Sequence, residues 1–216
     1  MAEHRQAGEP VVLIHGLWMR GLVMRPLAAR LRHAGFAPHC LDHASLRSAP
    51  EATLARLADL VRELHVCPVH LVGHSLGGVL ALALCRMHPE LPIGRIVCLG
   101  SPLAGSRSAR RLRELGVPWL AGRSRDLLEQ GVSPPDGVEV GMLAGTRAFG
   151  AGQWLSRIES PHDGTVSVAE TRVAGLADHR CLAHSHTGLL FARDVAEAVA
   201  GFLRGGSFPV GRKSQQ

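Results

Sequence analysis

One segment of the 216-residue chain constrains its fold more than any other. A short apolar run, Val69 to Val72, leads directly into the turn sequence Gly73-His-Ser-Leu-Gly-Gly78, and a nearly all-apolar stretch follows as far as residue 87. A continuous apolar run that ends at glycine is typical of a parallel strand covered on both faces. The stretch after the turn has the length and character of a buried helix. The segment therefore predicts a buried strand, a tight turn and a buried helix in immediate succession.

The same alternation of apolar runs and helical patterns continues along the chain. It predicts an α/β fold with a mostly parallel sheet of about six strands and helices on both faces. The expected strands cover residues 11–14, 36–41, 69–72, 95–99, 138–143 and 180–183. The expected helices cover residues 22–34, 51–64, 76–87 and 188–204. In the first helix, the apolar residues Leu22, Val23, Leu27 and Leu31 lie at helical spacing, and Pro26 lies in the first turn, where proline is tolerated.

Two regions depart from this alternation. Residues 103–137 carry six arginines, Trp119 and little strand signal, and they predict a small helical insertion between the fourth and fifth strands. Residues 205–216 are rich in Gly, Ser and Pro and predict a flexible tail. We expect a single domain over residues 1–216, because this length suits one core.

Composition excludes several classes of protein. The net charge is +6, but the basic residues are dispersed, tyrosine is absent and aromatic residues are few, so nucleic-acid recognition is not expected. No run of about 18 apolar residues occurs, and the N-terminus has no apolar signal region, so we expect neither a membrane-spanning helix nor secretion. The odd number of cysteines, five, without a CxxC pair, favours reduced thiols and a cytoplasmic location.

The turn after the third strand has the pattern G-x-S-x-G, from Gly73 to Gly77. Between a strand and a helix, this pattern holds a serine in strained backbone geometry, and small flanking residues prevent clashes with the neighbouring strand and helix. The serine oxygen then stands above the carboxyl edge of the sheet. Ser75 is therefore the candidate nucleophile. The alternative is a glycine-rich turn that contains a serine by chance.

A second turn of interest, His15-Gly16-Leu17, follows the first strand. In this architecture, the N–H after His-Gly and the N–H after the nucleophile form an oxyanion hole, which here gives Leu17 and Leu76. Trp18 and Met19 are the candidate substrate-binding residues, since they could line an acyl pocket. They could equally pack beneath the insertion.

Five segments resemble the α/β-hydrolases of the bacterial lipase and esterase group. They are VVLIHGLW (11–18), VHLVGHSLGG (69–78), VCLGSPLAGS (97–106), HDGTV (162–166) and HSHTGLLF (184–191). The last resembles the histidine segment of the small, nearly lidless lipases. The resemblance implies a minimal α/β-hydrolase fold without the first two antiparallel strands, with the insertion partly capping the site.

The acid and the base of a catalytic triad should follow the nucleophile in that order. Asp163 opens D-G-T-V, which resembles the acid turn of the family, although an Asx turn with Gly164 is the plainer use. The other acidic candidates are Asp136, Glu139, Glu159 and Asp178.

His186 matches His-x-Gly-Leu-Leu and directly precedes the last helix, so it is the candidate base. His184 is the main alternative, and His179 lies at the wrong end of its strand. Together with Cys181 these histidines could suggest a metal, but their spacing fits no zinc pattern, so neither a metal nor a cofactor is expected.

These residues predict a serine hydrolase that cleaves carboxylic esters through an acyl-enzyme, with Ser75, Asp163 and His186 as the triad. The expected substrate is a small-molecule or lipid ester, and the alternatives are acyl transfer or thioester hydrolysis on the same triad, or a non-catalytic binding protein. Trp119 and the arginine-rich insertion could form a lid or make transient contact with a membrane surface, although a solvated helical face is the plainer interpretation. The oligomeric state is left open.

Overall fold

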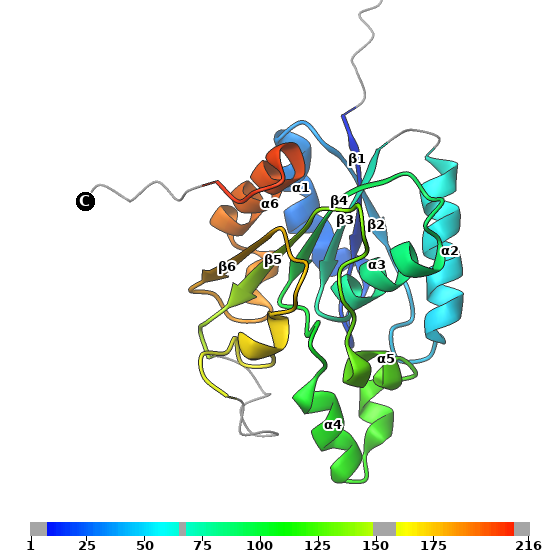
Figure 1. Cartoon of the computed structure of the whole chain (residues 1–216), viewed down its shortest axis with the longest axis vertical. Coiled ribbons are helices and arrows are strands. Elements are labelled where there is room, and N and C mark those ends of the chain that lie inside the picture. Colours follow the sequence, from blue (N-terminus) through cyan, green and yellow to red (C-terminus); the bar gives the residue numbers. More distant parts are fainter. Residues whose placement is uncertain (1–7, 65–67, 149–158, 210–216) are drawn as a thin grey trace, which may run out of the picture.

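A six-stranded sheet runs through the middle of the computed structural model, which describes residues 8–64, 68–148 and 159–209 (Figure 1). The strand order is β2-β1-β3-β4-β5-β6, and every neighbouring pair is parallel. The expected sheet of about six strands is confirmed, with boundaries that differ by up to two residues at each end. The strands are β1 Pro10–Ile14, β2 Ala37–Leu41, β3 Val69–His74, β4 Ile93–Leu99, β5 Val140–Gly145 and β6 Asp178–Leu182.

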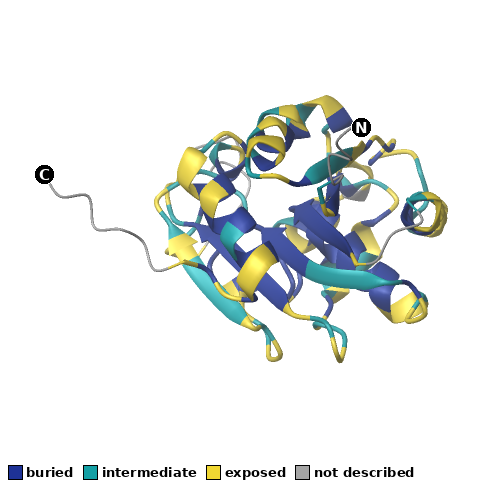
Figure 2. Cartoon of the chain, turned by 90° about the horizontal axis from the view of Figure 1, so that it is seen from above, coloured by how far each residue is buried: buried dark blue, intermediate teal, exposed yellow. Residues whose placement is uncertain are grey.

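Helices cover both faces of the sheet, because side chains along each buried strand alternate between the two faces. In β1, Val12 and Ile14 join one apolar cluster and Val11 and Leu13 join the other. The first cluster includes helices α2 (Pro50–Glu63) and α3 (Leu76–Met87), and the second includes α1 (Arg25–His33) and α6 (Arg193–Gly205). Figure 2 shows the buried residues gathered between these layers. Within the described ranges, no helix has the length and apolar character needed to cross a membrane.

The first helix begins later than the periodicity predicts. Gly21–Met24 forms a separate 3-10 turn, and α1 starts at Arg25. Pro26 explains the break, because its ring would clash with the carbonyl of Leu22 in a continuous α-helix. Leu27 and Leu31 are buried, but Leu22 lies before α1 and is 61% exposed, so its placement in the helix was wrong.

The insertion between β4 and β5 is helical, as expected. It consists of α4 (Arg107–Glu114), the 3-10 turn η2 (Pro118–Ala121) and α5 (Arg125–Gln130), which lie together at the lower end of the molecule in Figure 1. The Ser106 hydroxyl caps α4 by accepting a hydrogen bond from the Ala109 N–H at 3.1 Å. Leu112 and Leu128 are buried in the apolar cluster that includes α2 and α3, so the insertion shares that part of the core.

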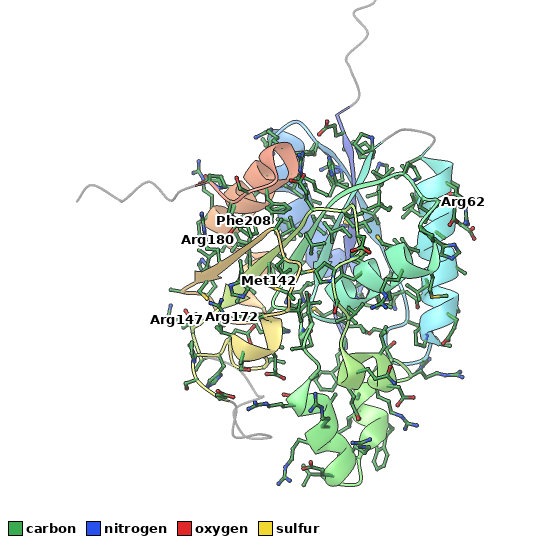
Figure 3. The ribbon with its side chains drawn as sticks, in the orientation of Figure 1. Arg62, Met142, Arg147, Arg172, Arg180 and Phe208 are labelled. Atoms are coloured by element: carbon green, nitrogen blue, oxygen red, sulfur yellow. The ribbon has the colours of Figure 1, made fainter. Side chains whose placement is uncertain are left out.

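The segment expected to be a flexible tail starts with ordered packing. Gly205 is the last residue of α6, and Gly206 follows it in the left-handed conformation that commonly ends a helix. The centroid of the buried Phe208 ring lies 4.9 Å from that of the Phe202 ring, and the Arg180 guanidinium lies over the Phe208 ring (Figure 3). The Gly- and Ser-rich composition of this segment gave no sign that Phe208 is buried. Residues 210–216 lie outside the described part of the chain.

Candidate active site

Ser75 occupies the sharp turn between β3 and α3. Its backbone has φ 54° and ψ −119°, a conformation that residues other than glycine rarely adopt. The turn is held in place because the Ser75 N–H donates to the Leu99 carbonyl of the neighbouring strand at 2.9 Å. The strained geometry predicted for the candidate nucleophile is therefore present at this position.

The glycines of the motif are required by backbone contacts. A Cβ atom added at Gly73 would lie 2.3 Å from the carbonyl carbon of Gly77. A Cβ atom added at Gly77 would lie 2.1 Å from the Ile14 carbonyl oxygen on β1. Neither backbone atom can move aside, so any larger residue at these positions would force α3 away from the sheet.

Asp163 and His186 meet directly although 23 residues separate them. The His186 Nδ1 atom lies 2.7 Å from the Asp163 Oδ2 atom, and both side chains are largely buried. The His186 N–H also donates to the Asp163 carbonyl at 2.9 Å. The other carboxylate oxygen, Oδ1, accepts from the N–H groups of Thr165 and Val166 at 2.9 and 2.8 Å. The D-G-T-V turn thus holds the carboxylate facing the ring.

These contacts determine the protonation states of the pair. Burial opposes ionisation of Asp163, but the adjacent His186 and the hydrogen bonds from His186, Val166 and Thr165 keep the pKa of Asp163 below its ordinary value. A carboxylate can only accept, so His186 carries its proton on Nδ1. The Nε2 atom then carries the free lone pair that can take a proton from a serine hydroxyl.

The alternative histidines have other partners. His184 pairs through Nε2 with Asp194 at 2.8 Å. His179 lies near the start of β6, and its Nε2 atom is 2.9 Å from the Thr171 hydroxyl. Of the three candidates, His186 is therefore the one that meets Asp163.

The other acidic candidates are also engaged elsewhere. Glu159 pairs with Arg107 at 2.7 Å, and Glu139 pairs with Arg95 at 2.7 Å. Asp178 is the first residue of β6, so it lies at the amino end of the parallel strands, away from Ser75, and it accepts a hydrogen bond from the Phe208 N–H. Asp136 is exposed in the loop before β5. Over the described ranges, no group of three or more His, Cys, Asp or Glu is placed to hold a metal ion.

Two further glycines let the pieces of the site approach one another. Gly100, at the end of β4 with φ +55°, would carry a Cβ atom 3.0 Å from the Asp163 Oδ2 atom and 3.1 Å from the His186 Nδ1 atom. A Cβ atom on Gly16 would lie 3.0 Å from the Ser75 Cβ atom. The Ser75 hydroxyl forms no hydrogen bond to another described residue. Catalytic hydrogen bonds of this kind often close only when a substrate is bound.

The two candidate oxyanion donors have suitable surroundings. Leu76 is the first residue of α3, so its N–H has no partner within the helix. At Leu17 the peptide is oriented by His15, whose Nδ1 atom donates to the Gly16 carbonyl at 2.9 Å while its Nε2 atom accepts from the His43 N–H at 3.3 Å. In a trans peptide the Leu17 N–H points away from the Gly16 carbonyl. His15 thus has a structural role beside the candidate oxyanion donor Leu17.

Sequence reasoning missed the partner of His15. The rings of His15 and His43 stack with centroids 3.9 Å apart, and His43 is buried. Burial, followed by the proximity of His15, lowers the pKa of His43 to about 4, so this ring is neutral near pH 7. Nothing in the local sequence links the two positions.

The candidate substrate-binding residues differ in their exposure. Trp18 is 57% exposed and has φ 59°, whereas Met19 is partly buried against the cluster that contains α1 and α6. Of the two, Trp18 offers the larger surface to a substrate. Their role in binding stays a prediction.

Glu170 supports the acid turn and was also missed. It is buried, and its Oε2 atom accepts from the N–H and the hydroxyl of Ser167, both at 2.8 Å, at the start of the 3-10 turn η4 (Ala169–Thr171). Its Oε1 atom accepts from the Arg107 N–H at 2.7 Å, which ties α4 to the same loop. The S-x-x-E pattern of a capping box, Ser167 to Glu170, was the available signal.

Comparisons with known proteins agree with this fold. A model of the alpha/beta hydrolase family matches residues 11–207. The mature Bacillus licheniformis lipase superposes with a TM-score of 0.77 over 96% of both chains, at 20% sequence identity. An Exiguobacterium antarcticum esterase gives a TM-score of 0.64 at 14% identity, covering 92% of this chain and 93% of its own. The type II thioesterase of the borrelidin biosynthetic cluster gives 0.64 at 19% identity, covering 93% of each.

These structural similarities establish a shared fold. No curated protein sequence matches the chain. The family model, by contrast, spans nearly the whole length between the two termini. The chain therefore belongs to the alpha/beta hydrolase family.

Proposed function

We propose that the protein is a serine hydrolase that cleaves carboxylic esters through an acyl-enzyme intermediate. Ser75 is the nucleophile, His186 the general base and then the general acid, and Asp163 the residue that orients the imidazole. The main support is the buried hydrogen bond of 2.7 Å between His186 and Asp163, at the same edge of the sheet as the strained Ser75 turn.

The proposed chemistry follows from the protonation states. His186 takes the hydroxyl proton through Nε2 while Ser75 attacks the ester carbonyl, and Asp163 stabilises the imidazolium. The N–H groups of Leu17 and Leu76 bind the developing oxyanion. Each such donor typically lowers the barrier by about 3 kcal/mol. His186 then protonates the leaving alcohol, and water attacks the acyl-enzyme in a second, equivalent round.

The proposed substrate class is an acyl ester of a small or lipid alcohol. Thioester hydrolysis is the second candidate, because a thioesterase shares the fold at a TM-score of 0.64. The same triad and oxyanion donors would serve both leaving groups. The leaving group and the shape of the acyl pocket would therefore decide between them.

The test is hydrolysis of p-nitrophenyl esters from short to long acyl chains, beside matched acyl thioesters, by wild type and Ser75→Ala. We expect ester turnover that Ser75→Ala abolishes, with a chain-length optimum that sizes the acyl pocket. Turnover that survives in Ser75→Ala would refute the assignment. A kcat/KM for thioesters well above that for esters would favour the second candidate.

A further inference from the structure

His74, the first of the two unspecified residues of the G-x-S-x-G motif, contacts the loop that carries His186. It is the last residue of β3, directly before Ser75, and it is completely buried. Its Nε2 atom lies 2.9 Å from the His186 carbonyl oxygen. The two imidazole rings lie with centroids 4.6 Å apart and an interplanar angle of 49°. Residues 112 positions apart are thus joined beside the candidate nucleophile.

The direction of this hydrogen bond follows from its acceptor. A carbonyl oxygen can only accept, so the His74 ring carries its proton on Nε2. Burial, followed by the proximity of His186, lowers the pKa of His74 to about 3, so the ring is neutral at the pH where the enzyme would work. The Nδ1 atom of His74 then carries no proton. Consistently, it has no hydrogen-bond partner among the described residues.

The contact supplies what the Asp163 loop cannot. His186 has three hydrogen bonds to described residues, and two of them, from its N–H and its Nδ1 atom, go to Asp163. Those two fix the ring relative to the acid turn. The third, from His74 to the His186 carbonyl, fixes the same residue relative to the strand that carries Ser75. The His74 side chain therefore connects the strand that carries Ser75 directly to the backbone of His186.

We propose that His74 is a positioning residue, and this inference rests on the proposed function. His74 holds the backbone of His186 so that the Nε2 atom of His186 stays within reach of the Ser75 hydroxyl. His74 acts through His186 and touches no reacting atom. A misplacement of about 1 Å in such a site costs on the order of 100-fold in rate. The donor at Nε2, and not merely the volume of the ring, is the feature that matters.

Two substitutions separate the donor from the volume. His74→Phe keeps a ring of similar size and removes the donor, whereas His74→Gln places an amide N–H at a reach similar to that of Nε2. On a soluble short-chain ester, we expect His74→Phe to lower kcat by about 100-fold with KM changed less than about two-fold. We expect His74→Gln to recover most of that loss. Thermal unfolding of each variant controls for loss of the fold.

Three results would overturn the proposal. They are near-wild-type kcat in a folded His74→Phe, equal impairment in the Gln and Phe variants, or a loss confined to KM. Ser75→Ala distinguishes this failure from that of the proposed function. If Ser75→Ala abolishes turnover while His74→Phe is normal, only the positioning role fails, and if Ser75→Ala stays active, the proposed function itself fails.

A measurement on the wild-type protein keeps the proposal testable if the Phe variant does not fold. Long-range 15N NMR spectra of the histidine rings report which nitrogen carries the proton. We expect His74 as the Nε2–H tautomer, still neutral at pH 5. The Nδ1–H tautomer would contradict the bond to the His186 carbonyl, because Nε2 would then have no proton to donate.

Discussion

Gly100→Ala should lower activity by more than its effect on stability explains. Gly100 has φ +55°, and left-handed backbone geometry costs an alanine about 1–2 kcal/mol. For a chain of this size, that corresponds to a fall in Tm of about 2–8 °C. The added Cβ atom would also lie 3.0 Å from the Asp163 Oδ2 atom and 3.1 Å from the His186 Nδ1 atom, so the pair must shift by a few tenths of an ångström.

That shift should appear in kcat. A misplacement of about 1 Å costs on the order of 100-fold, so the smaller shift should lower kcat for a soluble ester by about 10-fold. Gly137→Ala is the matched control, because Gly137 has φ +78° and its Cβ atom would meet nothing within 4 Å. It should show a similar fall in Tm with unchanged kcat. If Gly100→Ala keeps wild-type kcat at a temperature where both variants are folded, the reasoning is refuted.

Three further predictions test other parts of the structure. His186→Ala should lower kcat by on the order of 10⁴-fold or more. His184→Ala loses only a partly exposed contact with Asp194, so its kcat should stay within about two-fold of wild type. A larger loss in His184→Ala than in His186→Ala, measured on an ester, would reassign the base. The pKa of His43 lies below its unfolded value, so the unfolded chain takes up the proton first, and His43 alone should contribute about 3 kcal/mol to the unfolding free energy that wild type loses as pH falls from 6.5 to 4. His43→Phe should lose less in urea titrations over this range, and an unchanged pH dependence would exclude the effect. Glu170→Gln should cost about 1–3 kcal/mol, because an amide cannot accept every hydrogen bond made to the carboxylate, and Glu197→Gln on the exposed face of α6 should cost below about 1 kcal/mol. Equal losses in the two glutamate variants would argue against a supporting role for Glu170.

The sheet could be predicted because each buried strand is a short apolar run that ends at a turn. β1 and β3 have this form, and their order in a parallel sheet places the turns that follow them at one edge. Ser75 could be selected because it directly follows β3 in a recognisable turn sequence, whereas Asp163 and His186 could be selected because their segments resemble the acid turn and the histidine segment of the family. Periodicity failed at Leu22, because Pro26 delays the start of α1 to Arg25. Composition misled at Phe208, where one buried aromatic residue anchors a segment of loop-like composition.

The residues that support the site could not be selected from local patterns. His15 and His43 stack across 28 positions, and His74 reaches the His186 carbonyl across 112. Each of these contacts depends on the order of the strands in the sheet, and a lone histidine in an apolar stretch gives no indication of its partner. Gly100 likewise matches a common turn residue until the fold brings Asp163 and His186 against it.

The central claim is that Ser75 is the activated nucleophile. Incubation with a fluorophosphonate probe, followed by intact-mass measurement and peptide mapping, tests it directly, because such probes form a stable adduct only with an activated serine. The account predicts one adduct per chain on Ser75, none in Ser75→Ala, and slower labelling in His186→Ala. A folded wild-type protein that is not labelled, or an adduct on another residue that persists in Ser75→Ala, would contradict it.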